Sequence, residues 1–515
     1  MQIYDTTLRD GAQTEGISFS TEDKIDILSR LDAFGIDFVE GGFPASNPKD
    51  RAFFGEAQRL ELRNAKLVAF GSTRKKGRRV GEDPSIKALL ESNTEWVCLF
   101  GKSWDLHVRK VLRSPLEENL ELIEDSVSHL ASKGRKVIFD AEHFFDGWKE
   151  NQAYAIEVLE TAERAGAEYL VLCDTNGGSL PGDVSEAVRA AKRSNRTRIG
   201  IHTHNDAELA VANSLAALEA GATMVQGTVN GIGERCGNAN LCSIIPTLAL
   251  KMRREISIKD LNKLVSISTF IGEIANVLPD PRLPYVGTSA FAHKGGVHVG
   301  AVMRDPRTYE HVDPGTVGNS RRILVSELTG VSGILAKAKE LGIEEAEEKG
   351  RIVLERLKAM ESEGFQFEGA EASFDLLVRR LKGEAEPHFR LEGFRVLVDV
   401  SGDSMRSEAI VKVVDPQGEV EHTASEGNGP VNALDRALRK ALMKFFPNIR
   451  DVRLVDYKVR VIDTRSATSA RVRVLIKSTD GSKSWTTVGV STNIIEASLM
   501  ALLDSIEYKL LNERS

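Results

Sequence analysis

The sequence is poor in the residue types that mark several classes of protein. Its 515 residues include only four cysteines, without paired close spacing, which argues against both a disulfide framework and a Cys-x-x-Cys metal site. No apolar run approaches membrane-spanning length, and the opening MQIYDTTL lacks the charged region and apolar core of a signal peptide. We therefore expect a cytoplasmic protein that does not enter a membrane.

Neither sign of charge dominates the composition. Lys and Arg number 68 against 75 Asp and Glu, which gives a net charge of -7, so no nucleic-acid partner is expected. Hydrophobic residues make up 41% of the chain and charged residues 28%, as in ordinary globular proteins. A chain of this length exceeds what one hydrophobic core organises, so two or three domains are predicted.

The first half of the chain alternates short apolar runs with longer amphipathic stretches. The runs of strand length are Gln2–Thr7, Asp37–Phe43, Lys66–Ser72, Trp96–Gly101, Lys136–Ala141, Tyr169–Asp174, Arg198–Thr203 and Thr223–Val229. Segments with apolar residues at helical spacing include Thr21–Phe34, Leu116–Lys133, Asn151–Ala165, Leu180–Ser194 and Leu209–Ala220.

Eight βα units in roughly 250 residues predict an α/β fold, with a (β/α)8 or TIM barrel over residues 1–275. A doubly wound open sheet is the alternative. Polar clusters such as AEHFFDG, DTNGG and THND come directly after the predicted strands. These clusters favour the barrel, because a barrel places its active site at the rim where the strands end.

Beyond the barrel the pattern changes twice. The proline-rich connector LPDPRLPYVG and a charged helical region from Ile334 to Leu381 predict a helical linker subdomain over residues 276–390. From about Phe394, two segments each read as strand, turn, strand, glycine-bearing loop and helix, which predicts a duplicated α+β domain over residues 391–515. Chance similarity between two hairpin–helix units is the alternative.

His202 and His204 form the sharpest candidate site. They lie two residues apart at the end of the seventh predicted strand, so both imidazoles point the same way. Asp10 follows the first strand, which a closed barrel places near the seventh. Two His and one carboxylate with open positions suit a catalytic divalent metal such as Mn, Mg, Co or Zn. The alternative is a pair of rim histidines that bond only to their neighbours.

Further rim residues suit a 2-oxo acid, whose keto and carboxylate oxygens can chelate such a metal. Arg9 could stabilise the alkoxide that forms on attack at the carbonyl, or could simply pair with Asp10. Asp140 and Glu142 are candidates for acid/base chemistry or for a structural ion pair. Thr175 could hold the substrate carboxylate or belong to a simple turn.

Three motifs in order along the chain carry a family resemblance. DTTLRDGAQ at 5–13, HTHND at 202–206 and NGIGERCGNANL at 230–241 resemble the DRE-TIM metallolyases, in particular the alpha-isopropylmalate, homocitrate and citramalate synthases. The resemblance covers essentially the whole chain. It implies a polarising Arg9, the metal ligands Asp10, His202 and His204 with Asn238 near the metal, the substrate-side residues Gln13 and Thr175, and the catalytic residues Glu142, His298 and Tyr309.

Within the family, EGGFPASNPKDRAFF and FDAEHFFDGWK resemble one citramalate synthase subgroup. This implies an acyltransferase that condenses acetyl-CoA with pyruvate in isoleucine biosynthesis. Asp140 stands where other citramalate synthases carry a tyrosine, so we expect Asp140 in the keto-acid pocket. Action on a larger 2-oxo acid, as in 2-isopropylmalate or homocitrate synthases, is the alternative.

Two other classes of function compete with a synthase. A lyase on the same barrel is disfavoured because GERCGN stands where 3-hydroxy-3-methylglutaryl-CoA lyases carry a GGCP-type loop. An amino-acid sensor without catalysis is disfavoured because the set of candidate site residues is complete.

The resemblance further implies an intertwined homodimer, in which His298 acts within one chain or on its neighbour. It also implies a carboxyl-terminal regulatory domain that binds isoleucine, with a pure dimerisation module as the alternative. We expect Gly427–Gly429 and Gly489–Thr492 to form loops that face each other, with backbone N–H groups suited to a carboxylate.

Overall fold

The computed structural model of this chain describes residues 1–277, 279–324, 370–383, 385–401, 404–462 and 470–512, together with 352, 355–357, 359–360 and 362–367. It divides into two compact units, Met1–Phe291 with Val312–Ser320, and Ala292–His311 with the residues from Arg321 onward. Half of the helical region predicted from Ile334 to Leu381 lies outside the described residues.

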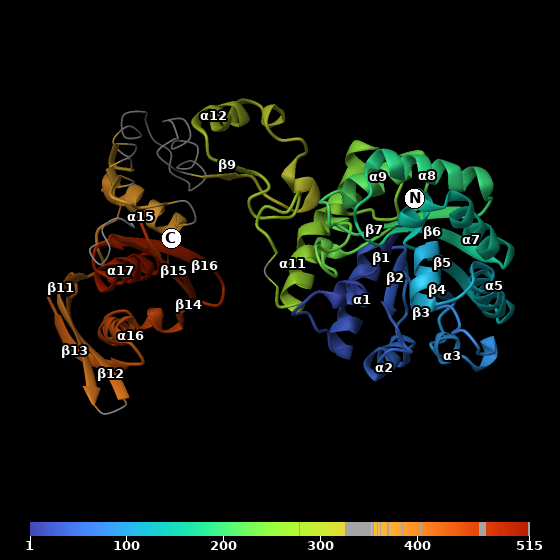
Figure 1. Ribbon diagram of the computed structural model, residues 1–515. Helices are drawn as coiled ribbons and strands as arrows, with labels where there is room; N and C mark the ends of the chain where they lie inside the picture. Colours follow the sequence, from blue (N-terminus) through green and yellow to red (C-terminus); the bar gives the residue numbers. More distant parts are fainter. Residues whose placement is uncertain are drawn as a thin grey trace. The chain divides into compact units, whose positions relative to one another are not determined.

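Eight parallel strands close the first unit into a barrel (Figure 1). Each strand pairs with the next along the chain, and β8 pairs back with β1, which closes the sheet. The predicted (β/α)8 barrel is therefore confirmed and the open sheet is wrong. The strands are β1 (Gln2–Asp5), β2 (Phe38–Gly42), β3 (Lys66–Ser72), β4 (Trp96–Lys102), β5 (Lys136–Glu142), β6 (Ala167–Asp174), β7 (Arg198–Thr203) and β8 (Met224–Gly227).

Helices surround this sheet on the outside (Figure 1). Ser20 and Asp23 form a capping box at the start of α1, and Asn47 and Asp83 cap α2 and α3, each directly before a proline. The predicted strands and helices of this region agree with the observed bounds within two residues. The helices are α1 (Thr21–Phe34), α2 (Pro48–Ala57), α3 (Pro84–Glu91), α4 (Asp105–His107), α5 (Leu116–Ser132), α6 (Phe144–Glu150), α7 (Gln152–Arg164), α8 (Pro181–Ser194), α9 (Ala210–Ala220), α10 (Leu241–Pro246) and α11 (Leu264–Ile274).

Alternate side chains along each strand pack on opposite faces of the barrel sheet. Tyr4, Phe38, Trp96, Tyr169 and Met224 belong to the cluster inside the barrel. Their neighbours in the same strands, such as Ile3 and Val39, pack in the larger core with the helices. The barrel is thus apolar on both faces and filled, and its polar groups gather at the carboxyl ends of the strands.

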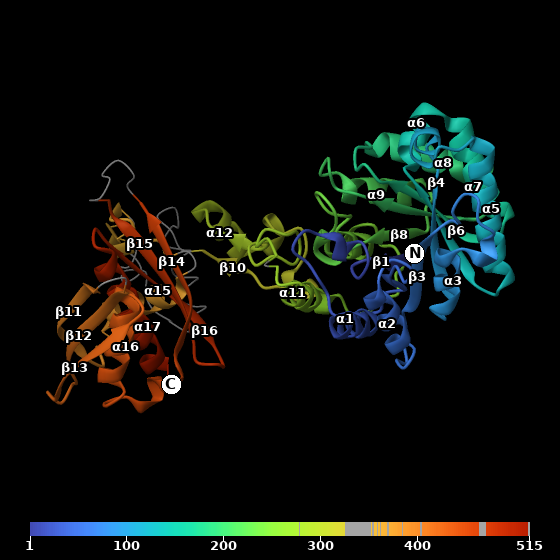
Figure 2. The same ribbon diagram turned by 60° about the horizontal axis from the view of Figure 1, so that its bottom comes forward.

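The second unit begins with a short strand pair, β9 (Ala292–His293) with β10 (Arg322–Ile323), around helix α12 (Gly296–Arg304). After α15 (Glu371–Lys382) come two three-stranded antiparallel sheets, each followed by a helix that packs on it (Figure 2). The predicted duplicated α+β domain is therefore confirmed. The first repeat is β11 (Arg390–Ser401), β12 (Ser404–Val414), β13 (Val420–Gly427) and α16 (Pro430–Leu442), and the second is β14 (Arg453–Val461), β15 (Val472–Thr479), β16 (Ser484–Ser491) and α17 (Ile494–Asn512).

The expectation of two glycine loops in this domain is wrong in part. Gly427 ends β13 and Gly489 lies inside β16, so neither is in a loop. A Cβ at Gly427 would collide with the backbone N of Ala433, and one at Gly489 with the carbonyl O of Ala497. These glycines let each sheet approach its helix closely, which is a packing role.

No helix in the described part of the chain is long and apolar enough to span a bilayer.

Candidate active site

A pocket of about 270 Å³ opens at the carboxyl ends of the barrel strands. All eight strands, or the loops directly after them, contribute to it, as expected where parallel strands end at one rim. Charged and polar residues form one part of its wall, and three phenylalanine rings form another. The lining residues are Arg9, Asp10, Gln13, Phe43, Phe70, Phe100, Asp140, Glu142, Cys173, Thr175, His202, His204, Glu234 and Arg235.

Asp10, His202 and His204 meet in this pocket. Each is buried, and together they offer three ligand atoms within 4.8 Å of one another. Nε2 of His202 lies 3.5 Å from Asp10 Oδ2, and Nε2 of His204 lies 3.9 Å from the same oxygen. Thr203, between the two histidines, faces outward and donates to the carbonyl of Ala210 at 3.0 Å. Strand alternation thus sends both imidazoles to one side, as predicted.

The protonation states of this cluster fit a divalent cation. Burial lowers the pKa of His202 and lowers that of His204 to about 4, so both imidazoles are neutral near pH 7. Burial alone would raise the pKa of Asp10, but the Arg9 guanidinium and the two histidines outweigh it and the pKa falls to about 2. Neutral imidazole and carboxylate are the forms that bind a metal.

Asn238 adds an amide oxygen beside this cluster. Its Oδ1 is buried without a hydrogen-bond partner among the described residues, and its backbone bridges to that of His204. The loop can fold this tightly because Gly237 has a φ of 91°, and because a Cβ at Gly233 would collide with the Asn238 side chain. The glycines of GIGERCGN therefore let the Asn238 backbone lie beside that of His204, and a role for its side chain near a metal stays a prediction.

Arg9 is fixed by two carboxylates and a ring. Its Nε pairs with Glu40, its Nη1 lies 3.0 Å from Asp10 Oδ2, and its guanidinium carbon lies 3.9 Å from the centre of the Phe70 ring. Glu40 is fully buried and also accepts a hydrogen bond from Thr6 Oγ1 at 2.7 Å. Burial would lower the pKa of Arg9, but Glu40 and Asp10 raise it above its ordinary value.

Sequence reasoning missed Glu40. The signal was a single carboxylate inside the apolar run FVEGG of β2, where a charged residue has to find a partner.

Asp140 connects to the histidine cluster through a residue that sequence reasoning also missed. Gln226, in β8, donates from Nε2 to Asp140 Oδ1 at 3.1 Å, and its Oε1 lies 2.9 Å from His202 Nδ1. Burial and the charge of Glu40 raise the pKa of Asp140 to about 7. Asp140 thus lines the pocket, as expected, and is also bonded behind it to Gln226.

Glu142 and Thr175 line the pocket with partners of their own. Glu142 pairs with Lys102 at the end of β4. Thr175 Oγ1 accepts a hydrogen bond from the backbone N–H of His143 at 2.9 Å, and its carbonyl accepts one from Arg235 at 2.7 Å.

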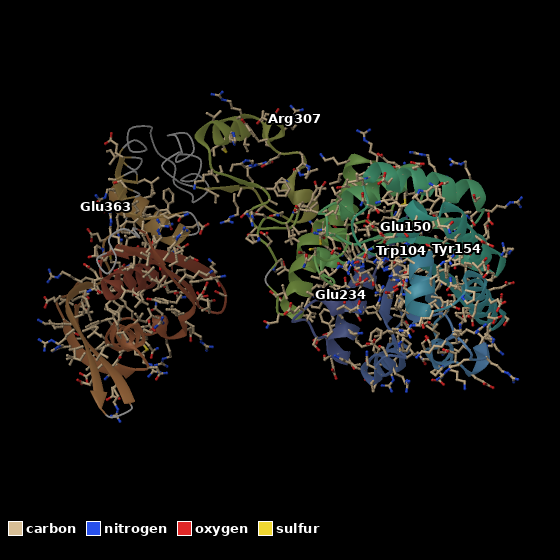
Figure 3. All side chains as sticks on the ribbon, viewed as in Figure 1. Trp104, Glu150, Tyr154, Glu234, Arg307 and Glu363 are labelled. Carbon is tan, nitrogen blue, oxygen red and sulfur yellow. The ribbon has the colours of Figure 1, made fainter. Side chains whose placement is uncertain are left out.

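The mouth of the pocket is formed by residues of two loops. Gln13 is exposed there, in the short helical turn Gly11–Gln13. Glu234, labelled in Figure 3, lies in the loop after β8, which contacts the loop after β1 through a hydrogen bond from Thr14 Oγ1 to the Gly233 carbonyl at 3.2 Å.

His298 and Tyr309 belong to the second unit, and the structure brings them together. Their rings stack with centroids 4.2 Å apart and an interplanar angle of 29°. Both side chains are exposed. A catalytic role for this pair stays a prediction.

The apolar part of the wall is an aromatic cluster of Phe43, Phe70 and Phe100. The rings of Phe70 and Phe100 stack at 5.2 Å, and that of Phe43 meets them edge-on at 5.7 and 6.4 Å. Sequence reasoning did not single these residues out, because a phenylalanine at a strand end has the pattern of a core residue.

Known proteins resemble the chain from end to end. It matches the HMGL-like family model over residues 1–271, the homocitrate synthase post-HMGL domain-like model over 285–364 and the LeuA allosteric (dimerisation) domain over 368–510. The (R)-citramalate synthase of Aquifex aeolicus is 53% identical, with 99% of this chain and 98% of that protein covered. That of Geobacter sulfurreducens is also 53% identical, with 99% and 97% covered. The 2-isopropylmalate synthase of Methanocaldococcus jannaschii is 31% identical, with 99% and 95% covered.

Proposed function

The chain belongs to the HMGL-like family, among its (R)-citramalate synthases, and we propose that it joins the methyl carbon of acetyl-CoA to the keto carbon of pyruvate and then hydrolyses the thioester. The observation that carries this proposal is the buried cluster of Asp10, His202 and His204 beside Arg9. This cluster lines a pocket whose wall also contains three phenylalanine rings. A small 2-oxo acid needs charged groups for its keto and carboxylate oxygens and an apolar surface for its side chain.

We propose that Asp10, His202 and His204, with Asn238 beside them, hold a divalent cation. When bound, the cation supplies a Lewis acid that polarises the keto carbonyl. The donor set supports this, because it consists of a carboxylate, two neutral imidazoles and an amide oxygen without a partner among the described residues. The same donors suit Mn, Mg, Co and Zn.

Arg9 is the residue we assign to the charge that develops on the keto oxygen. When the methyl carbon attacks, the carbonyl electron pair moves onto oxygen, and the alkoxide later takes up a proton to become the hydroxyl. A guanidinium held by Glu40 and stacked on Phe70 is in place before that charge forms, so no reorganisation is needed. Its charge is also independent of pH.

The acetyl methyl group has to lose a proton before it can attack, and we propose two candidate bases. Glu142 lies in the pocket wall, with Lys102 beside it to orient the carboxylate. His298, stacked on Tyr309, lies in the other unit and would act on the barrel of its own chain or of a neighbouring subunit. After the carbon–carbon bond has formed, water cleaves the thioester and releases coenzyme A as a free thiol.

We propose pyruvate as the 2-oxo acid because of the aromatic cluster. Its carboxylate and ketone would face the charged residues, which leaves only a methyl group for Phe43, Phe70 and Phe100 to cover. A branched side chain would need space in a pocket of about 270 Å³ that also has to admit the acetyl group. Discrimination on this basis amounts to ~1–3 kcal/mol per methyl or methylene group.

The carboxyl-terminal domain is, in our proposal, a dimeric regulatory domain that binds isoleucine. Its match to an allosteric and dimerisation domain supports this. A cavity of about 470 Å³ between α16 and β14 offers charged groups, Asp435 and Arg439, next to apolar side chains such as Val431 and Leu454. A zwitterion with a branched side chain needs both kinds of contact. We propose in addition that the chain acts in isoleucine biosynthesis and in the cytoplasm, where a reducing environment suits its four free cysteines.

A panel of 2-oxo acids tests the catalytic proposal. Purified protein with acetyl-CoA and Mn or Mg is given pyruvate, 2-oxobutyrate, 2-oxoisovalerate or 2-oxoglutarate, and free thiol is measured. We expect pyruvate to give the highest kcat/KM and citramalate as the product by mass spectrometry, with no turnover in His202→Ala. Preference for 2-oxoisovalerate or 2-oxoglutarate would instead identify a 2-isopropylmalate or homocitrate synthase. If none of the four acids releases thiol from acetyl-CoA, the chain is instead an amino-acid sensor without catalysis.

A further inference from the structure

Two neighbouring loops at the rim of the barrel carry cations that the proposed chemistry does not use. The loop after β3 reads TRKKGRR at 73–79, with five basic residues and no acidic one, and the segment after β4 reads VRKVLR at 108–113, with three basic residues. Such a concentration is notable in a chain whose net charge is -7. We define the basic patch as the side chains of Lys75, Arg78, Arg79, Arg109, Lys110 and Arg113.

The loop after β3 is held in place by its neighbours. The backbone N–H of Arg74 donates to Ser126 Oγ at 2.9 Å, and that of Lys75 donates to Asp83 Oδ2 at 2.9 Å. The Arg74 guanidinium pairs with Asp125 at 2.6 Å. Because these bonds fix the backbone, the loop presents its remaining cations from a defined position.

The same bonds join the two loops. Lys76 donates from Nζ to the carbonyl of Arg113 at 3.4 Å and pairs with Glu118 at 2.6 Å. Arg74 and Lys76 therefore serve the structure. The six side chains of the basic patch are exposed, and none has a carboxylate partner within 4.0 Å in the described part of the chain. A cluster of exposed cations without counter-charges attracts polyanions.

The basic patch adjoins the pocket. Phe70 of β3 and Phe100 of β4 belong to the pocket wall. The first basic segment follows β3 directly, and the second begins after the short helix α4 that follows β4. Phe100 pairs in register with Ser72, and its carbonyl accepts a hydrogen bond from Thr73 N–H at 3.1 Å. A ligand can therefore reach from the stacked rings to the cations along one side of the rim.

We infer that the basic patch binds the nucleotide end of acetyl-CoA, with its arginines on the diphosphate and the 3′-phosphate. This inference rests on the proposed function, because acetyl-CoA is the one substrate there that carries phosphates. Its charge lies at the far end of a long pantetheine arm from the thioester, which matches a patch beside the pocket and outside it. Guanidinium groups suit phosphate because they donate two parallel N–H bonds. Binding energy gained there positions the acetyl group in the pocket.

A paired comparison of variants tests this inference. Arg78→Ala with Arg79→Ala removes two cations from the basic patch. The matched control, Lys133→Ala with Arg193→Ala, removes two exposed cations that precede β5 and β7, at the opposite end of the barrel. Each protein is assayed with pyruvate and either acetyl-CoA, acetyl-dephospho-CoA, which lacks the 3′-phosphate, or acetyl-pantetheine, which lacks all phosphates. Coenzyme A binding without pyruvate is measured by calorimetry.

We expect the patch variant to raise the KM for acetyl-CoA and the Kd for coenzyme A on the order of tenfold, as loss of charge-assisted bonds to phosphate requires. Its kcat/KM for acetyl-pantetheine and its KM for pyruvate should stay at the wild-type values, and the control should match wild type throughout. The preference of wild type for acetyl-CoA over acetyl-dephospho-CoA should shrink in the patch variant.

Three outcomes would overturn the inference. One is a coenzyme A Kd in the patch variant equal to that of wild type. Another is an equal rise of the KM for acetyl-CoA and of the Kd for coenzyme A in the control variant. The third is an equal loss of kcat/KM with acetyl-pantetheine, which would indicate general damage to the barrel. Failure of the proposed function has a different signature, because wild type would then release no thiol from any of the three thioesters.

Discussion

His202 Nδ1 lies 2.9 Å from Gln226 Oε1, and this contact decides which edge of the imidazole is left for a cation. The amide oxygen can only accept, so Nδ1 has to carry the proton, and the unprotonated Nε2 faces Asp10. Gln226 is itself oriented by its bond to Asp140. The buried hydrogen bonds that link Asp140, Gln226 and His202 therefore set the tautomer of one proposed metal ligand.

Removing Gln226 should weaken metal binding. Gln226→Leu keeps the approximate volume but leaves Nδ1 without its acceptor, and loss of such an orienting partner typically costs ~10–100-fold in metal affinity. Titration of metal-stripped protein with Mn, followed by electron paramagnetic resonance, measures this Kd directly. Thr203→Val, a buried change on the outward face of β7 next to His202, is the control and should bind Mn like wild type. An unchanged Kd in Gln226→Leu would mean that Gln226 does not orient His202.

Glu40 should be needed for both stability and turnover. Glu40→Gln leaves a buried guanidinium without its main partner, which should lower the free energy of unfolding by about 3–5 kcal/mol in urea titrations. It should also lower kcat, because Arg9 loses its fixed orientation. The double variant Glu40→Gln with Arg9→Met should regain stability without regaining activity. If the single variant is as stable as wild type, Arg9 does not depend on Glu40.

Asp140 should make stability depend on pH. Burial, with the nearby Glu40, raises its pKa from 3.8 to about 7, so the folded chain keeps a proton that the unfolded chain has already released. The contribution of this group to stability therefore falls as pH rises from about 4 to about 7, and it stays low above that range. In metal-stripped protein, the Tm of Asp140→Asn minus that of wild type should increase from about pH 5 to about pH 8. A difference that is flat across this range would contradict the ionisation of a buried Asp140.

The stacked pair of His298 and Tyr309 gives a prediction about subunit exchange. His298→Asn and His202→Ala should each be inactive alone. If His298 acts across a dimer, a mixture of the two variants should recover part of the activity, because one kind of hybrid site contains both intact residues. Failure to recover activity despite subunit exchange, confirmed by mass spectrometry, would place both residues in one chain.

Filling the cavity beside α16 should abolish feedback. Isoleucine should lower the rate and raise the Tm of wild type, and Val431→Trp should remove both effects by occupying the cavity without changing its charges. Val420→Trp, at an exposed position in β13 outside the cavity, should respond like wild type. If isoleucine, leucine and valine leave the rate and the Tm of wild type unchanged, the domain serves dimerisation alone.

The barrel could be predicted from sequence because its strands are apolar on both faces and its helices carry local start signals. The predicted bounds of β7 and of α1 are those observed. His202, His204 and Asp10 could be placed together because strand alternation and barrel closure are general rules. Glu40 and Gln226 could not be placed in the site from sequence. Their partners Arg9 and Asp140 are distant in sequence and meet them only through the stagger of the strands. Gly489 was assigned to a loop because close sheet–helix packing leaves no separate mark in the sequence.

Cys236 is exposed at the pocket rim, two residues before Asn238, whereas the other three cysteines are buried. A colorimetric reagent that traps the thiol of released coenzyme A will therefore also react with the enzyme, close to the proposed metal ligands. Inactivation during such an assay would be mistaken for a low rate or for product inhibition. Following the loss of thioester absorbance, or working with Cys236→Ser, separates the chemistry of the detector from that of the catalyst.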